Sequence, residues 1–128
     1  LKRFFAGELF RRIGKAKQAL REYAFISAVP AAALAETDEE KAGLDPKADT
    51  VLIQGVADLV LVFEDHVEIV DYKTDHNKTA DELLRDYAAQ LRLYARAIGL
   101  RLAPNPVTRC TLYSFALGRE VDVPLRGM

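Results

Sequence analysis

The sequence predicts a single α/β (α+β) domain spanning residues 1–128. Segments rich in apolar and β-branched residues recur along the chain, as in strands that share a sheet. One long stretch between them has helical periodicity. The length suits one domain with a modest core, and the composition, half hydrophobic and 29% charged, is ordinary for a globular protein. The expected order is helix, strand, hairpin, helix and strand.

A helix and a strand are expected first. Residues 1–20 space large apolar side chains among basic ones at roughly helical intervals, although two glycines weaken this pattern. Residues 21–29 have the composition of a strand, which Pro30 ends. Residues 31–50 are rich in alanine and then in acidic residues, which indicates a loop or mobile insertion without chemistry of its own.

A β-hairpin is predicted in the middle of the chain. Residues 51–63 form a long apolar run that a glycine and Asp58 interrupt, and residues 67–73 form the second arm after a polar turn. The hairpin therefore carries Asp58 in one arm and Asp71 in the other.

The clearest helix covers residues 79–98. Thr79 and Glu82 form a capping-box pattern at its start, and Gly99 is a good stop. Its apolar stripe repeats at spacings of three and four. The stripe consists of Leu84, Tyr87, Leu91, Tyr94 and Ile98. After two prolines, residues 107–117 are predicted to form the last long strand, with a short strand close behind it.

Cysteine content and hydropathy limit the class of protein. The single Cys110, expected in the core, excludes an intramolecular disulfide and a multi-cysteine zinc or iron–sulfur site within this chain. No apolar run approaches the roughly 20 residues that span a bilayer, and no secretory segment is present, so a cytoplasmic protein is expected. Leu1 is not a natural initiator, which indicates a fragment of a larger protein.

Charge is unevenly distributed. Residues 1–28 carry seven Lys/Arg against two Asp/Glu, residues 29–75 carry three against twelve, and residues 76–128 carry eight against five. Acidic residues in the middle suit a cation site, and basic flanks suit phosphates. Solvated surface of both signs is the plainer alternative.

Asp58 lies in the most apolar segment of the chain. A lone carboxylate there is costly unless it is paired or bound to a metal. Gly55, three residues earlier, leaves space beside the strand or marks a bulge. An aspartate at a bulge that accepts backbone N–H bonds is the alternative.

Asp71 and Lys73 are two residues apart in the next strand. The strand period of two places them on one face, with Val70 and Tyr72 on the other. Taken alone, this motif is equally compatible with a surface ion pair.

Together these residues predict a metal-dependent site for phosphodiester hydrolysis. The hairpin can set Asp58 and Asp71 opposite one another, and two close carboxylates repel unless a cation lies between them. Oxygen ligands select Mg²⁺ or Mn²⁺, which lowers the pKa of bound water and stabilises charge on a phosphate oxygen. Lys73 is expected to orient the attacking water and to neutralise charge in the transition state.

The remaining polar residues are weaker candidates. Gln90 and Tyr94 lie four apart on one helix face, and the amide needs a partner, which a catalytic lysine, a DNA phosphate or a backbone group would supply. Glu22 is either a further metal ligand or a surface residue. Asp75 is expected to cap the turn, and both histidines are expected to face solvent.

Three motifs, each weak alone, occur in a specific order and spacing. They are Gly55-Val-Ala-Asp58, Asp71-Tyr-Lys73 and Gln90-Leu-Arg-Leu-Tyr94. This order resembles the RecB-like branch of the PD-(D/E)XK nuclease superfamily. The strings at residues 69–75 and 21–25 are most similar to the nuclease domains of AddA-type helicase–nucleases, and the resemblance covers nearly the whole chain.

The resemblance implies a restriction-endonuclease-like core, in which helices flank a central mixed β-sheet. It implies Mg²⁺-dependent exonuclease activity, with Mn²⁺ as a substitute, on a single DNA strand fed by the helicase portion of the same polypeptide. It further implies a role in double-strand break repair together with an AddB-type partner. The site residues that it implies are Asp58, Asp71 and the Tyr72 carbonyl as metal ligands, Lys73 as catalytic lysine, and Gln90 and Tyr94 as supports for the site and the strand.

The chain departs from the family pattern in two respects. The histidine that the family carries on a helix before its first strand is missing, and His66 and His76 are not placed to replace it. No phosphate-binding Gly-Lys-Ser/Thr loop is present, so ATP would act only in an absent helicase part. A stand-alone nuclease of the same superfamily, and a non-catalytic module that binds DNA or docks a partner, remain the alternatives.

Overall fold

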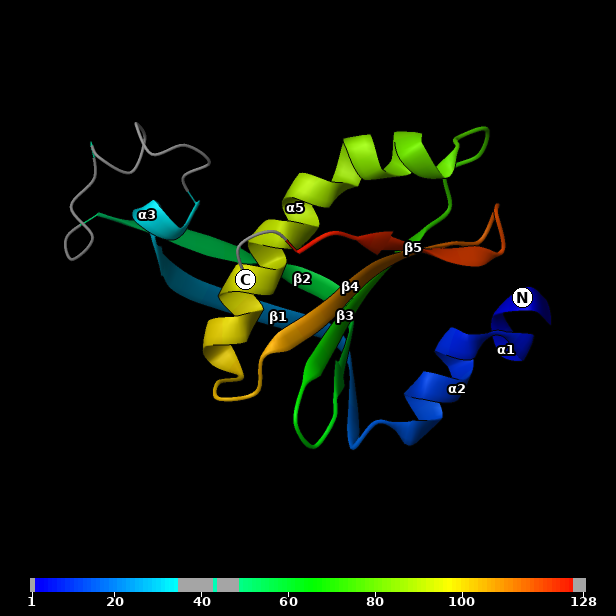
Figure 1. Ribbon diagram of the computed structural model, residues 1–128, viewed down its shortest axis with the longest axis horizontal. Coiled ribbons are helices and arrows are strands. Elements are labelled where there is room, and N and C mark those ends of the chain that lie inside the picture. Colours follow the sequence, from blue (N-terminus) through cyan, green and yellow to red (C-terminus); the bar gives the residue numbers. More distant parts are fainter. Residues whose placement is uncertain (1, 35–42, 44–48, 126–128) are drawn as a thin grey trace.

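The computed structural model of the chain describes residues 2–34, 43 and 49–125 (Figure 1). Its elements, in chain order, are α1 (Lys2–Ala6), α2 (Glu8–Lys15), β1 (Gln18–Pro30), α3 (Ala31–Leu34), β2 (Thr50–Val62), β3 (Val67–Lys73), α5 (Ala80–Arg101), β4 (Val107–Ser114) and β5 (Arg119–Val123). None of the helices in this part of the chain has the length and hydropathy needed to cross a membrane.

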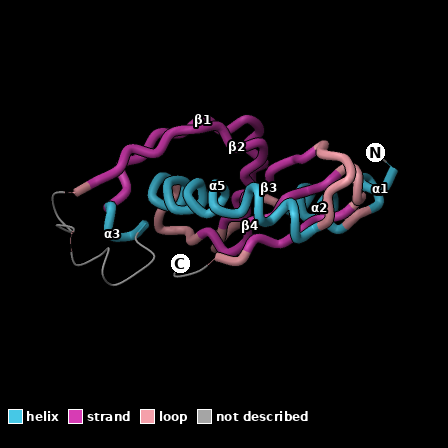
Figure 2. Tube along the Cα trace, turned by 90° about the horizontal axis from the view of Figure 1, so that it is seen from above, coloured by secondary structure: helices cyan, strands magenta, loops and turns pink. Residues whose placement is uncertain are grey.

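The five strands form one mixed sheet in the order β1-β2-β3-β4-β5. Strands β3 and β4 are parallel, and the other neighbouring pairs are antiparallel. The parallel pair requires a crossover, and α5 supplies it by carrying the chain back along the sheet. The sheet curves around α5, with β1 and β2 on one side of the helix and β4 on the other (Figure 2). The expected mixed sheet flanked by helices is confirmed.

Each face of the sheet has its own apolar core. Alternate side chains of β3 separate the two, since Ile69 packs under α5 whereas Val70 packs with Leu9 of α2. Cys110 is 1% exposed and belongs to the core under α5, as predicted. The helices α2 and α5 therefore cover opposite faces of the sheet.

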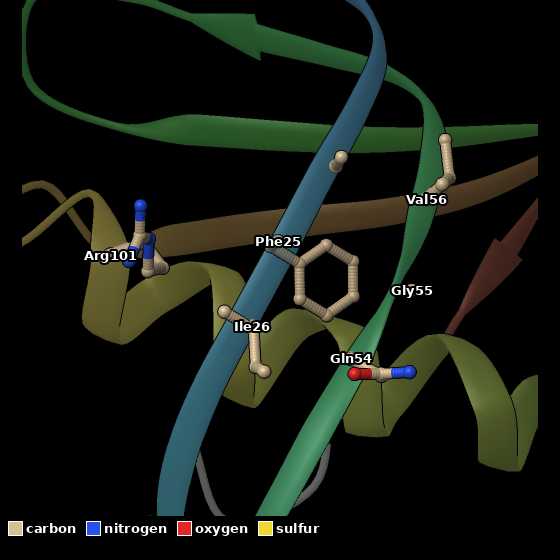
Figure 3. Close-up of a pocket in the computed structure, with 7 residues that line it drawn as sticks. Phe25, Ile26, Gln54, Gly55, Val56 and Arg101 are labelled. Atoms are coloured by element: carbon tan, nitrogen blue, oxygen red, sulfur yellow. The ribbon is translucent and has the colours of Figure 1, made fainter.

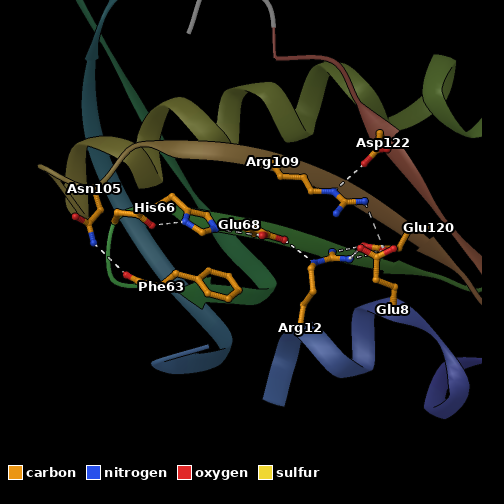
Figure 4. A network of polar contacts seen from close by, with 10 residues as sticks. Glu8, Arg12, Phe63, His66, Glu68, Asn105, Arg109, Glu120 and Asp122 are labelled. Atoms are coloured by element: carbon orange, nitrogen blue, oxygen red, sulfur yellow. Dashed lines mark hydrogen bonds and ion pairs between the residues drawn. The ribbon is translucent and has the colours of Figure 1, made fainter. Parts of the chain in front are cut away.

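An ion cluster fixes α2 to the sheet (Figure 4). The Arg12 guanidinium donates from Nε to Glu68 Oε1 at 2.9 Å and from Nη1 to Glu120 Oε2 at 2.9 Å. The three side chains are largely buried, with 13%, 9% and 12% exposed for Arg12, Glu68 and Glu120. The hydrogen bond to Glu120 is the main cause that raises the pKa of Arg12, so this cation stays charged.

The predicted N-terminal helix is wrong in its extent. It is interrupted at Gly7 and ends at Lys15, and β1 already begins at Gln18. The apolar residues near position 20 belong to the strand, where Leu20 pairs with Val60. Within the predicted loop at 31–50, Ala31–Leu34 is helical, and most of the rest, with its acidic run, lies outside the described residues.

The capping box at the start of α5 is confirmed. The Thr79 hydroxyl accepts from the Glu82 N–H, and the Glu82 carboxylate accepts from the Thr79 N–H. Gly99 does not end the helix, which continues to Arg101. A helical glycine costs about 0.5–1 kcal/mol, and packing of the neighbouring buried Ile98 offsets that cost.

Two further expectations need correction. The last long strand ends at Ser114 rather than at residue 117, because residues 115–118 form a turn in which Gly118 has φ +69°. The buried face of α5 is also wider than the predicted stripe. It includes Leu83, Ala88, Leu91, Ala95, Ala97 and Ile98, whereas Leu84, Tyr87 and Tyr94 are only partly buried at its edges.

Candidate active site

The two predicted carboxylates meet where β2 and β3 separate. Backbone pairing between these strands runs from Val62–Val67 to Leu59–Val70, so Asp58 lies one residue beyond the last pair, beside Asp71. The Asp58 carboxylate accepts a hydrogen bond from the Tyr72 backbone N–H at 2.8 Å, in place of the next ladder bond. The alternative for Asp58, a backbone N–H acceptor, is thus part of the site's geometry.

Strands β1 and β2 change the face that they present to α5 at this same point. Ala57 and Val60 both pack in the core under α5, although residues three apart in a regular strand face opposite sides. Leu20 and Tyr23 do the same in β1, and Glu22 between them has φ +49°. Asp58 is therefore placed at an irregularity of the sheet rather than in a regular strand.

Lys73 lies beside Asp71 on the α5 side of the sheet. Its Nζ is 2.7 Å from Asp71 Oδ2 and 3.9 Å from the centre of the Tyr87 ring of α5. Val70 and Tyr72 pack in the core on the other face, as the strand period predicts.

Burial and mutual repulsion shape the charges of the site. Burial, reinforced by Asp58 and opposed by Lys73, raises the pKa of Asp71 to about 6. Burial alone would lower the pKa of Lys73, but the Asp71 carboxylate raises it, so the ammonium group is retained. A second positive charge between the two carboxylates would relieve their repulsion and lower the pKa of Asp71.

The donor set suits a small, hard divalent cation. Asp58 and Asp71 offer carboxylate oxygens from neighbouring strands, and their repulsion favours a cation between them. No group of three or more His, Cys, Asp or Glu residues in the described part of the chain is arranged to hold a metal. Mg²⁺ is usually bound by only one or two carboxylates and keeps several waters, so two side chains are sufficient.

Gly55 gives Tyr94 its place against β2. A Cβ atom at Gly55 would lie 2.5 Å from the Tyr94 hydroxyl oxygen, so no other residue fits there without displacing the ring. The ring also packs edge-to-face on Phe25, with centroids 4.9 Å apart. Gln90 Nε2 donates to the Tyr94 hydroxyl at 3.4 Å, so the two helix residues are linked to each other. The prediction that Gly55 leaves space beside the strand is confirmed.

A groove near Gly55 is separate from the carboxylate pair (Figure 3). It is lined by Ala24, Phe25, Ile26, Gln54, Gly55, Val56 and Arg101. None of the predicted catalytic or metal-binding side chains lines it, so its position gives no support to the site.

The structure does not gather every candidate. Glu22 is exposed and is not grouped with Asp58 and Asp71, and its role as a further ligand stays a prediction. Asp75 does not cap the turn, since its carboxylate accepts from the Tyr87 hydroxyl at 2.7 Å and pairs with Lys78 at 2.9 Å.

The histidines lie away from the pair, as expected, but only one is exposed. His76 faces solvent. His66 is 29% exposed because it stacks on Phe63, with centroids 4.4 Å apart, and bonds Asp65 and Glu68.

Tyr87 is the contact that the sequence pattern missed. The helical periodicity assigned it to the apolar stripe, whereas its ring contacts Lys73 and its hydroxyl bonds Asp75. Its position three residues before Gln90, at the edge of the stripe, was the available signal.

Comparison with known proteins gives the same direction. Residues 2–122 match the family model described as the PD-(D/E)XK nuclease superfamily. Similar curated proteins are named as the A subunits of ATP-dependent helicase/nucleases. That of Ligilactobacillus salivarius is 33% identical over 94% of this chain and 9% of its own length, and that of Lactiplantibacillus plantarum is 38% identical over 82% and 8%. That of Carboxydothermus hydrogenoformans is 37% identical over 94% and 10%. The chain thus spans about a tenth of the length of these relatives.

Proposed function

Because the chain belongs to the PD-(D/E)XK nuclease superfamily, we propose that it is the nuclease domain of an AddA-type helicase–nuclease. In this proposal it hydrolyses phosphodiester bonds of single-stranded DNA with the help of Mg²⁺, for which Mn²⁺ can substitute. The observation that carries the proposal is the convergence of Asp58 and Asp71 at the end of the β2–β3 ladder, with the Lys73 ammonium beside them.

Each residue has a distinct role in this proposal. Asp58 and Asp71, with the Tyr72 backbone carbonyl, hold the cation, and Glu22 is the candidate for a further ligand. When bound, the cation would lower the pKa of water and stabilise negative charge on a phosphate oxygen. Lys73 is a permanent positive charge that attracts the scissile phosphate and orients the attacking water.

Gln90 and Tyr94 are proposed to support the site and the DNA strand. Their mutual hydrogen bond and the close fit of the Tyr94 ring on Gly55 fix this part of α5 against β2. Gln90 is exposed, so its amide is available to a phosphate group.

The wider role rests on the names of the relatives. We propose that the domain acts as an exonuclease in double-strand break repair in the cytoplasm, on a strand delivered by the helicase portion of the same polypeptide. ATP would serve only that portion, and an AddB-type partner would complete the enzyme. The name shared by the relatives, which combines helicase with nuclease, supports this assignment.

A metal requirement tests the proposal. The intact polypeptide that carries this chain should degrade labelled single-stranded DNA with Mg²⁺ or Mn²⁺, stop when EDTA is added, and resume when the metal is restored. Ca²⁺ in place of Mg²⁺ is the control, because it binds oxygen ligands with a looser geometry. DNA binding without any metal-dependent cleavage would instead favour a non-catalytic binding module.

A further inference from the structure

Lys73 has two partners, and only one of them is acidic. Its ammonium group contacts the Asp71 carboxylate at 2.7 Å and the face of the Tyr87 ring at 3.9 Å from the centroid. The side chain is 19% exposed, so solvent reaches only a small part of it. A lysine stem is flexible and holds one position only where packing restricts it. The ring is thus well placed to fix the ammonium group.

The Tyr87 ring is itself anchored to the segment that carries the lysine. Its hydroxyl donates to Asp75 Oδ2 at 2.7 Å, and Asp75 follows Lys73 by two residues at the end of β3. Asp75 also pairs with Lys78, whose ammonium contacts Asp86 of α5 at 2.7 Å. A hydrogen bond and an aromatic contact therefore tie α5 to both sides of Thr74.

The neutral ring keeps its contact where the acidic partner does not. In the proposed function Asp71 binds a divalent cation, which competes with Lys73 for the same carboxylate charge and repels the ammonium group. The Tyr87 face attracts a cation through its quadrupole and carries no charge that a metal would claim. A lysine held only by Asp71 would be displaced as the metal binds.

We propose that Tyr87 is a positioning residue that holds the Lys73 ammonium group in place, and that Asp75 anchors Tyr87 in that orientation. The inference rests on the proposed function, because Lys73 needs a fixed position only if it acts on a phosphate. Tyr87 does not touch the reacting atoms and acts through Lys73. The aromatic face is the essential part, and the hydroxyl sets its angle.

Substitutions at residue 87 separate the ring from its hydroxyl. Tyr87→Leu should lower kcat for DNA cleavage by about 10- to 100-fold with KM changed less than about threefold, since misplacing a catalytic group by ~1 Å costs about that much. Tyr87→Phe keeps the ring and should lose less than about 10-fold. Equal activity of Tyr87→Leu and the parent, at saturating metal, would overturn the proposal.

The anchor is tested by combining variants. Asp75→Asn and Tyr87→Phe weaken the same hydrogen bond, so the double variant should be no slower than the worse single variant. Additive losses would show that Asp75 acts elsewhere. Lys78→Met removes the ion pairs that tie the loop to α5 but leaves the ring, and it should stay within about threefold of the parent. A loss as large as that of Tyr87→Leu would assign the effect to the loop.

A spectroscopic measurement is independent of catalysis. The ring current of Tyr87 should shift the ε-methylene protons of Lys73 upfield in isotope-labelled protein. The shift should persist in Tyr87→Phe, vanish in Tyr87→Leu and survive addition of Mg²⁺. Tyr113→Phe, which removes a hydroxyl from a buried ring on the other face of the sheet, is the control for both assays.

These readouts distinguish the two ideas. If the intact parent polypeptide never cleaves DNA with Mn²⁺, the proposed function fails, and the proton shifts still decide whether Tyr87 holds Lys73. If the parent cleaves and the Lys73 protons are not shifted, the positioning role fails and the nuclease assignment stands.

Discussion

Asp71→Asn should abolish DNA cleavage while leaving the fold at least as stable as that of the parent. The carboxylate is one of only two side chains that we assign to the cation, and its loss removes several kcal/mol of charge stabilisation, or at least about 10³-fold in rate. Lys73→Ala should abolish cleavage for a different reason, since the charge beside the phosphate is lost. Both rates are measured on labelled single-stranded DNA at saturating Mg²⁺.

Stability should respond to pH through the same residue. Asp71 has a pKa of about 6 in the folded chain against an ordinary value of 3.8, so the folded chain binds more protons in this window. Its contribution to the free energy of unfolding therefore rises as pH falls from about 6 to about 4, in the absence of metal. Asp71→Asn should lack this rise in denaturant titrations at the two pH values.

A matched control separates the site from general effects of charge removal. Asp122→Asn removes a carboxylate that is 70% exposed and pairs with Arg109 on β4. Its cleavage rate should equal that of the parent. Parent-like cleavage by Asp71→Asn and Lys73→Ala would refute the assigned site.

Arg12→Leu should destabilise the fold by about 3 kcal/mol or more. It leaves Glu68 and Glu120 buried against α2 without their cation, and breaking a buried ion pair on one side typically costs about 3–5 kcal/mol. Arg109, 3.7 Å from Glu120, and the Thr111 hydroxyl compensate in part. Denaturant unfolding followed by circular dichroism gives the difference.

The origin of that loss can be checked within the same cluster. Adding Glu68→Gln and Glu120→Gln to Arg12→Leu removes the unpaired charges, so most of the stability should return. Arg85→Ala is the surface control, because its side chain is 73% exposed and its ion pairs contribute about 0.5 kcal/mol or less. If the triple variant is no more stable than Arg12→Leu, buried charge is not the cause.

The parts of the site that were predictable are local in the sequence. The strand period places Asp71 and Lys73 on one face, and a hairpin brings Asp58 to the neighbouring strand, whatever the rest of the chain does. The capping box at Thr79 is equally local, because all its atoms lie within one helical turn.

The parts that escaped prediction depend on distant partners. Arg12 meets Glu68 and Glu120 across 56 and 108 residues of sequence, and no periodicity reports such a contact. The positive φ of Glu22 follows from the way β1 and β2 turn around α5, not from the residue's own preference. Tyr87 has the same apolar spacing whether its ring packs in a core or covers a lysine.

Crystals of the protein soaked in Mn²⁺ give the most direct test, because anomalous scattering locates this ion without assumptions about catalysis. The proposed site predicts one or more Mn²⁺ peaks in direct contact with carboxylate oxygens of both Asp58 and Asp71, and none there in crystals of Asp71→Ala. A soak at concentrations that support cleavage, with the space between these carboxylates empty or Mn²⁺ held by other residues, would contradict it.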